Sequence, residues 1–447
     1  MRLAARHSAY GLLALCGLGV GAFLAGTTAL PDLRPHVPRY LLLLAGAFAC
    51  YGLALLLLWR RPDLATRRRV VPLVILVAVA IRLPLIPTTP TLSTDIHRYL
   101  WDGKVASAGI NPYRYSPNAA ELRHLHSEPA TPINFPPLRT PYQPVAQLFF
   151  QASFFLHGGR IWAFKALLGS VELALMLLLA GLLARAGLPR GQLLIYAWHP
   201  LAVAEVALGG HIDVLGTTLL AASLLWLIRT KMLPIGGIFF GLAVQTKLHA
   251  AVALPLLLRR GGHRWLGPAL AIAAGVYLPY LGARERIFDS LAAMLGSWQH
   301  NGSLYSIFQF ALRQAELDSG TSARLLSSLV GAGLVLALST APVRDERDLY
   351  RRLRAAFLFA LLASPFVPPW YLLWLLPFTC LAPSASALAW SALVSLLYLD
   401  TPPNRCPGIG WWEYIPVYAL LAWEVAQARL SGAPGKPSPP GPNQDVE

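Results

Sequence analysis

Charged residues are scarce in this chain of 447 residues, at 13% against roughly a quarter in average soluble domains. Hydrophobic residues make up 55%, so the polar surface that a soluble enzyme needs is missing. The apolar residues also form long runs, and Tyr40–Trp59 contains no charged residue. A helix needs about 20 mostly apolar residues to cross a bilayer. The composition therefore excludes a soluble enzyme and predicts an integral membrane protein with many helices.

Cysteine is rare, and glycine-rich nucleotide-binding loops are absent. None of the four cysteines stands in a Cys-x-x-Cys pair or in a Cys/His spacing typical of zinc or redox sites. Three of them, Cys16, Cys50 and Cys380, fall inside apolar runs, so a disulfide framework is not expected. The sequence therefore assigns no cofactor, and it leaves a requirement for a divalent metal open.

Acidic residues are the scarcer charge, with 21 against 37 basic residues and a net charge of +16. Such an excess is compatible with nucleic-acid binding. The basic residues, however, gather in short polar loops between apolar runs, and loop 60–69 alone carries five Arg. The positive-inside rule places loops of this kind in the cytoplasm, next to anionic lipid headgroups. We therefore expect the lipid bilayer, and no nucleic acid, as the partner of these charges.

Apolar segments recur along the chain, and we expect one all-α transmembrane domain over residues 1–430. They predict about 11–14 membrane helices, several of them short and interrupted by proline or glycine, as in broken or re-entrant helices. The pairs 233–258 and 353–382 are of this broken kind. The candidate segments are 9–30, 40–59, 70–87, 161–183, 191–208, 213–229, 233–246, 248–258, 265–282, 323–341, 353–364, 370–382, 384–399 and 412–428.

The basic loops set the expected orientation, because cytoplasmic loops carry the excess of Arg and Lys. These loops are 60–69, 185–190, 229–231, 259–264 and 344–354. Counting crossings between them places both chain ends in the cytoplasm. Residues 431–447, rich in proline and glycine, are expected to form a disordered cytoplasmic tail. The polar segments expected outside the plasma (inner) membrane are the first outer loop 88–140, 209–212, the second outer segment 283–322, and 400–411.

The first outer loop holds the most conspicuous polar residues. It is long for a connector, and its Trp, Tyr and Phe content argues against disorder. In the stretch TDIHRYLWDG, helical spacing would place Asp95 and Tyr99 on one face and Arg98 and Asp102 on the next. A partly desolvated carboxylate at the membrane boundary suits a general base. Asp95 would also suit the N-cap of the helix that follows.

Further ionisable residues lie where later spans end at the outer face. His211 and Asp213 stand in the motif GHID between two spans. There they could bind substrate, or they could only cap a helix and pack between loops. Lys247 lies at the outer turn of a broken pair. A cation there is costly unless it meets an anion such as a lipid phosphate, although it could also snorkel to the headgroups.

Amide and aromatic side chains complete the outer face. Asn301 belongs to the motif NGSLY, and Trp370 and Tyr371 end the stretch SPFVPPWY. Side chains of these types suit the recognition of sugar rings and hydroxyl groups. They equally suit the belt of aromatic residues that marks a membrane interface, so both interpretations stand.

Taken in order, these motifs resemble those of a known enzyme family. TDIHRYLWDG followed by GINPY resembles the first outer loop of bacterial polyprenyl-phosphate-mannose-dependent mannosyltransferases, which belong to the C-type (GT-C) glycosyltransferase superfamily. The resemblance continues through GHID, Lys247, NGSLY and SPFVPPWY and spans most of residues 90–380. One departure is NFPP at 134–137, where the family usually has a Tyr before two prolines.

The resemblance implies a GT-C-like fold of membrane helices with its catalytic face toward the periplasm or the cell exterior. It implies a polyprenyl-phosphate sugar as donor, with mannose favoured, and a glycan or glycolipid as acceptor. An acidic residue of the first outer loop is the base in such enzymes, and Asp95 matches that position. We then expect inversion at the anomeric carbon, with Lys247 and Arg98 at the donor phosphate. The other residues singled out above are expected to bind substrate.

Two rival classes account for part of the pattern. A transporter or flippase for lipid-linked sugars would explain the broken helices and the ionisable residues at their turns. In transporters, however, such residues lie near the bilayer midplane, whereas here they crowd at one face. A structural scaffold would explain none of the clustered polar residues. The sequence therefore favours a membrane hexosyltransferase.

Overall fold

The computed structural model describes residues 2–126, 132–228, 232–401, 404, 406 and 408–432. These residues form helices and no named strand, and extended pairing among them is limited to isolated bridges from His300 and Asn301 to Phe366. The predicted all-α class is thus confirmed. The predicted basic loop 229–231 and residues 433–447 of the predicted tail lie outside the described residues.

Most helices that fall in the predicted apolar segments begin and end near the predicted limits, whereas other α-helices lie outside those segments: Pro62–Ala65, Asp95–Ser107, Pro144–His157, Asp289–Ser297 and Ser303–Gln314. The 3-10 helices η8 (Leu248–Ala253) and η10 (Pro369–Trp374) interrupt the two pairs expected to be broken. The α-helices in chain order are α1 (Arg2–Ala25), α2 (Val37–Arg60), α3 (Pro62–Ala65), α4 (Val70–Arg82), α5 (Asp95–Ser107), α6 (Pro144–His157), α7 (Ile161–Arg185), α8 (Leu194–Ala197), α9 (Pro200–Val203), α10 (Asp213–Leu227), α11 (Leu233–Val244), α12 (Leu254–Gly261), α13 (Leu266–Gly275), α14 (Asp289–Ser297), α15 (Ser303–Gln314), α16 (Gly320–Thr340), α17 (Glu346–Ala363), α18 (Leu376–Leu381), α19 (Ala385–Leu393) and α20 (Ile409–Gly432).

Several helices are long and apolar enough to cross a membrane. In the described part of the chain these are the segments Ala9–Ala29, Arg34–Arg60, Ile161–Arg185 and Gly320–Thr340. Two bent helix pairs bring the number to six if each pair is one span: α9 with its π-helical extension and α10 meet at 118°, and α13 and Leu278–Ile287 meet at 77°. The chain is therefore a multi-pass membrane protein, and the larger number of spans stays a prediction.

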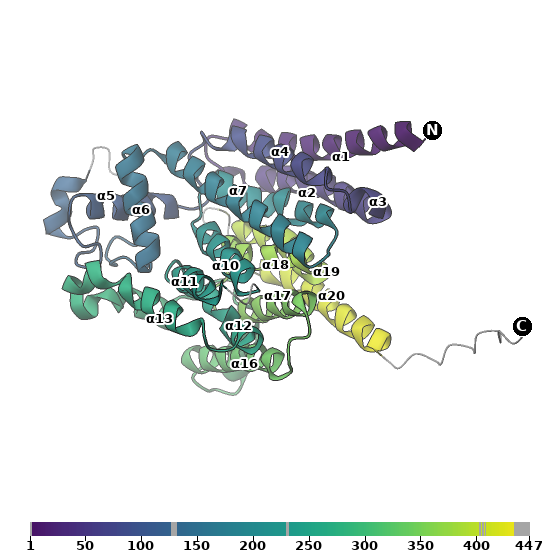
Figure 1. Cartoon of the computed structure of the whole chain (residues 1–447). Coiled ribbons are helices and arrows are strands. Elements are labelled where there is room, and N and C mark those ends of the chain that lie inside the picture. The colour runs from purple at the N-terminus through teal and green to yellow at the C-terminus, as the bar shows by residue number, and fades with distance from the viewer. Residues whose placement is uncertain are drawn as a thin grey trace, which may run out of the picture.

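The first outer loop and the Arg-rich loop lie at opposite ends of the molecule. Figure 1 shows α5 and α6 at one end. The N-terminal end of α1, the C-terminal end of α20 and α3, which belongs to the Arg-rich loop 60–69, lie toward the other end. This separation agrees with the crossing count from the basic loops, which puts 88–140 on the face opposite the two chain ends, and the orientation in the membrane stays a prediction.

Close backbone contact holds α5 against α6. Gly103 of α5 has no room for a side chain, because a Cβ there would lie 2.4 Å from the carbonyl oxygen of Phe150 on α6. The Tyr99 ring stacks on the Phe150 ring one turn away, with centroids 4.8 Å apart. The glycine therefore fixes the distance between the two helices, and with it the position of the first turn of α5.

We predict that Gly103→Ala destabilises the protein by about 1–3 kcal/mol, the usual cost of forcing a methyl group into a packed contact. Thermal unfolding of the detergent-solubilised protein measures the effect. Gly52→Ala in α2 is the matched control, since a Cβ at Gly52 meets no atom within 4 Å and Ala favours a helix over Gly. An equal stability of the two variants would contradict the proposed contact.

Candidate active site

A cavity of about 310 Å³ opens beside the first turn of α5. Its wall comes from α5, loop 134–143, the start of η8, α14, α16 and the segment 364–371. Five of the residues predicted from the sequence line it: Asp95, Arg98, Lys247, Trp370 and Tyr371. The other five lie behind this wall, each in contact with a lining residue: Tyr99, Asp102, His211, Asp213 and Asn301.

Asp95 presents its carboxylate to the cavity from the first turn of α5. Asn134 donates a hydrogen bond of 2.6 Å to Oδ1, and the Tyr99 hydroxyl lies 3.5 Å from Oδ2. The N-cap position of the helix is Thr94, which makes no side-chain cap. The Asp95 carboxylate is thus bonded to Asn134 across the loop and to Tyr99 one turn along the same helix, and not to the helix N-terminus, so the capping alternative does not describe it.

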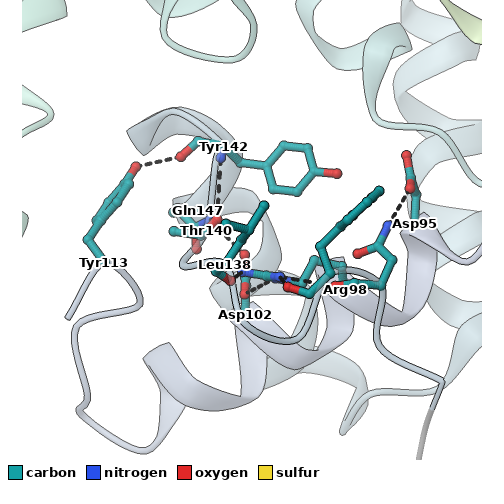
Figure 2. Close-up of polar contacts among 10 residues, drawn as sticks. Asp95, Arg98, Asp102, Tyr113, Leu138, Thr140, Tyr142 and Gln147 are labelled. Carbon is teal, nitrogen blue, oxygen red and sulfur yellow. Dashed lines mark hydrogen bonds and ion pairs between the residues drawn. The ribbon is translucent and has the colours of Figure 1, made fainter. Parts of the chain in front are cut away.

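Arg98 holds the loop that faces Asp95. Its guanidinium donates to the Asp102 carboxylate at 3.0 Å, to the Leu138 carbonyl at 2.9 Å and to the Asn134 carbonyl at 3.2 Å. Figure 2 shows this network, in which Gln147 of α6 also donates to Asp102. The predicted sharing of helix faces is confirmed. Since Arg98 is almost fully buried and its donors point at protein oxygens, it positions the loop that carries Asn134.

The residue after Asn134 adopts a strained backbone. Phe135 has a φ of +44°, a value that costs energy for any residue with a Cβ. Its ring is half exposed and lies 4.6 Å from the ring of Trp298, centroid to centroid. Strain of this kind persists where the surrounding structure enforces it, and here it places an aromatic ring at the cavity wall. Phe135 belongs to the sequence NFPP at 134–137, where the family usually has a Tyr before the two prolines.

Lys247 and Asp213 form a buried ion pair behind the cavity wall. The Lys247 ammonium lies 2.7 Å from both carboxylate oxygens of Asp213. Trp374 donates its indole N–H to Asp213 at 2.8 Å, and the Tyr371 ring lies 4.6 Å from the ammonium. The Lys247 side chain is 11% exposed. It reaches inward to a carboxylate, so snorkelling to the headgroups does not describe its position.

His211 lies in the turn between the two halves of a bent span. Gly210 takes a φ of +74°, and a Cβ there would lie 2.7 Å from the side chain of Ile96 on α5, so the glycine lets this turn approach α5. The His211 Nδ1 lies 2.9 Å from the Glu205 carboxylate. Its ring stacks on Trp370 with centroids 4.0 Å apart. His211 therefore supports an aromatic wall of the cavity from behind.

Asn301 connects the cavity to the last helix of the described chain. Its side-chain amide lies 3.1 Å from both carboxylate oxygens of Glu413 on α20, and Trp390 donates to the same carboxylate at 2.6 Å. The neighbouring His300 exchanges backbone hydrogen bonds with Pro365 and Val367. Asn301 thus lies outside the cavity and anchors the segment whose Phe366, Trp370 and Tyr371 form its wall.

The electrostatic surroundings of Asp95 suit a side chain that acts as a general base. Burial raises the pKa of its carboxyl above the ordinary value, and the nearby Asp213 carboxylate adds to this shift. His211 and Lys247 oppose it as positive neighbours. A carboxyl with a pKa above the usual value of about 3.9 accepts a proton more readily at neutral pH. The carboxylate at the cavity is therefore suited to remove a proton from a hydroxyl group.

Most lining residues are not among those predicted as site residues, and these include Asn134, Trp298 and Arg324. Asn134 could not be identified locally, because its role depends on a contact with Asp95 across 39 positions. Arg324 did leave a signal, since it is the only charged residue of α16, and an ionisable residue in an apolar helix indicates a functional site. Among the described residues, no group of three or more His, Cys, Asp or Glu side chains could hold a metal ion.

Comparison with known proteins relates the chain to one family. No match is found among the curated proteins or the solved structures that were compared. The family model described as alpha-(1->6)-mannopyranosyltransferase, N-terminal domain, matches residues 8–259. The match covers more than half of the chain and includes Asp95, Asp213 and Lys247. The chain thus belongs to the alpha-(1->6)-mannopyranosyltransferase family, and is a membrane mannosyltransferase of the GT-C type.

Proposed function

We propose that the protein transfers mannose from a polyprenyl-phosphate donor to a hydroxyl group of a glycan or glycolipid. The single observation that carries this proposal is the Asp95 carboxylate, which is partly buried, supported by Asn134 and open to a cavity lined by aromatic side chains. In the proposed reaction, the acceptor oxygen attacks the anomeric carbon while Asp95 takes the hydroxyl proton. The bond from that carbon to the phosphate oxygen breaks, and polyprenyl phosphate leaves with the electron pair.

The proposed displacement fixes the stereochemistry of the donor. A single displacement inverts the anomeric carbon, and the family description names an alpha-(1->6) linkage as the product. The donor mannose would then carry the β configuration, and the acceptor would offer a 6-hydroxyl group. Such a primary hydroxyl protrudes from a sugar ring, which suits an attack from within a cavity of about 310 Å³.

We place this reaction at the extracytoplasmic face. Support comes from the separation in Figure 1, where α5 lies at the end of the molecule opposite α3 in the Arg-rich loop. The positive-inside rule assigns that Arg-rich end, with both chain ends, to the cytoplasm. A lipid-linked donor suits this location, because the polyprenyl chain keeps the activated sugar at the membrane.

The experiment that tests the proposal supplies two radiolabelled donors to the reconstituted protein, polyprenyl-phosphate-mannose and GDP-mannose, with membrane-extracted glycans and glycolipids as acceptors. We expect label in the acceptor from the lipid donor alone. Transfer from GDP-mannose in the absence of the lipid donor would overturn the donor assignment. Movement of the lipid-mannose across liposome membranes without any transfer would favour the flippase class instead.

We also predict that, as the pH is lowered, the rate of transfer falls at a higher pH than it would with a base of ordinary carboxyl pKa. Asp95 acts in its charged form, and a raised pKa means that this form is lost earlier as the pH falls. Asn134→Ala removes a hydrogen bond to the charged form, which raises the pKa further. The acid limb of the kcat/KM profile should therefore move to higher pH in that variant. An unchanged or lower midpoint would contradict the role of Asn134.

A further inference from the structure

Three basic residues line the cavity, and two of them already have acidic partners. Arg98 pairs with Asp102 at 3.0 Å and Lys247 pairs with Asp213 at 2.7 Å. Each pair is close to neutral as a unit, so neither offers an uncompensated positive charge to a ligand. The third lining cation is Arg324 of α16, for which no ion pair with a carboxylate is found among the described residues.

In the part of the chain that the structure describes, the guanidinium of Arg324 is held in place by hydrogen bonds from only one of its three nitrogen atoms. One terminal nitrogen, Nη1, donates to the carbonyl oxygens of Leu295 at 3.1 Å and Trp298 at 3.0 Å. The Tyr305 ring lies 5.6 Å from the guanidinium carbon. Within the described residues, Nε and Nη2 have no protein acceptor. Two donors of a rigid planar group are thus available beside the cavity.

We propose that Arg324 binds the phosphate of the lipid-linked donor. This inference rests on the proposed function, and it moves the phosphate contact from Lys247 and Arg98 to a residue that has free donors. A guanidinium binds phosphate through two parallel N–H groups. As the bond to the anomeric carbon breaks, the phosphate gains a negative charge, so Arg324 stabilises the leaving group more strongly than the ground state.

The surroundings of Arg324 suit the tail of the same ligand. Leu291, Met294 and Leu295 of α14 line the cavity on this side. The Leu295 side chain is 57% exposed, and Leu329 on α16 is 59% exposed. The helix α16 is long and apolar enough to cross a membrane, so its exposed Leu329 is expected to meet lipid chains, and a polyprenyl chain leaving Arg324 would lie against this surface. The acceptor hydroxyl then approaches from the side of Asp95.

The test compares two competitive inhibitors of mannosyl transfer, farnesyl phosphate and farnesol, which differ only in the phosphate. In Arg324→Gln we expect the Ki of farnesyl phosphate to rise by about 10- to 100-fold, the loss expected for charge-assisted hydrogen bonds. The Ki of farnesol and the KM of the acceptor should not change. A purely structural role of Arg324 would weaken both inhibitors together, and that result would overturn the proposal.

Controls separate this inference from the function on which it rests. Arg313→Gln on α15 removes a solvent-exposed Arg outside the cavity and should leave both Ki values unchanged. Arg324→Lys keeps the charge without the planar fork, so it should weaken farnesyl phosphate less than Arg324→Gln does and leave farnesol unaffected. Unaltered farnesyl phosphate inhibition in both Arg324 variants would overturn the inference while leaving transfer intact. If the wild type transfers no mannose, the dissociation constants of farnesyl phosphate and farnesol are measured directly by isothermal titration calorimetry. Weaker binding of farnesyl phosphate alone in Arg324→Gln would then keep the inference, and only the proposed function would fail.

Discussion

Asp95→Asn should lower kcat for mannosyl transfer by about 100- to 10,000-fold, the contribution usually made by general acid–base catalysis. Asparagine has nearly the same shape and still offers an oxygen to Asn134, so the loop that faces the cavity keeps its position. What is lost is the ability to accept the proton of the attacking hydroxyl. The KM of the donor should change little, because the proposed phosphate ligand lies elsewhere in the cavity.

The measurement is the initial rate of transfer from radiolabelled polyprenyl-phosphate-mannose, with expression level and thermal stability recorded for each variant. Asp32→Asn is the control, because Asp32 is a solvent-exposed carboxylate paired locally with Arg34 and lies outside the cavity. It should transfer at the wild-type rate. A rate for Asp95→Asn within a few-fold of that control would remove Asp95 from the catalytic role.

The sequence identified those parts of the fold that depend on local pattern. An apolar run such as 40–59 predicts its helix directly, because membrane spans need only length and composition. The helix that begins at Asp95 also followed from local spacing, and the contacts at positions i and i+4 agree with it. By contrast, the helix α6 (Pro144–His157) was not among the predicted segments. Its position depends on the close contact of Phe150 with Gly103 of α5, which no local pattern contains.

The site required contacts that no local pattern contains. The substrate-binding role of Asn301 stays a prediction, but the contact of its amide with Glu413, which lies 112 positions away, was not predicted. Lys247 lines the cavity and its role at a phosphate stays a prediction, but its ion pair with Asp213 at the start of α10 was not predicted. In both cases the residue type was informative and the partner was not, because pairing is decided by packing between distant segments. The family match ends at residue 259, so Arg324 could be placed at the cavity only by the structure.

Among the proposed variants, the removal of Asp213 from its buried ion pair with Lys247 should have the largest effect on stability. In Asp213→Asn, the Lys247 ammonium loses a carboxylate with which it makes two contacts of 2.7 Å. A buried charge left without its partner typically costs about 3–5 kcal/mol. We therefore expect Asp213→Asn to lower the free energy of unfolding by about that amount, measured by denaturant titration in mild detergent.

The double variant Asp213→Asn with Lys247→Met distinguishes the unpaired charge from a simple loss of packing. It removes both charges, so most of the lost stability should return, whereas mannosyl transfer should stay low because Lys247 also forms the cavity wall beside Tyr371. Asp289→Asn, which breaks the exposed pair with Arg139, is the matched control and should cost less than about 1 kcal/mol. If the double variant is as unstable as Asp213→Asn, the carboxylate acts through its bond to Trp374, and the ion pair is not what stabilises this wall of the site.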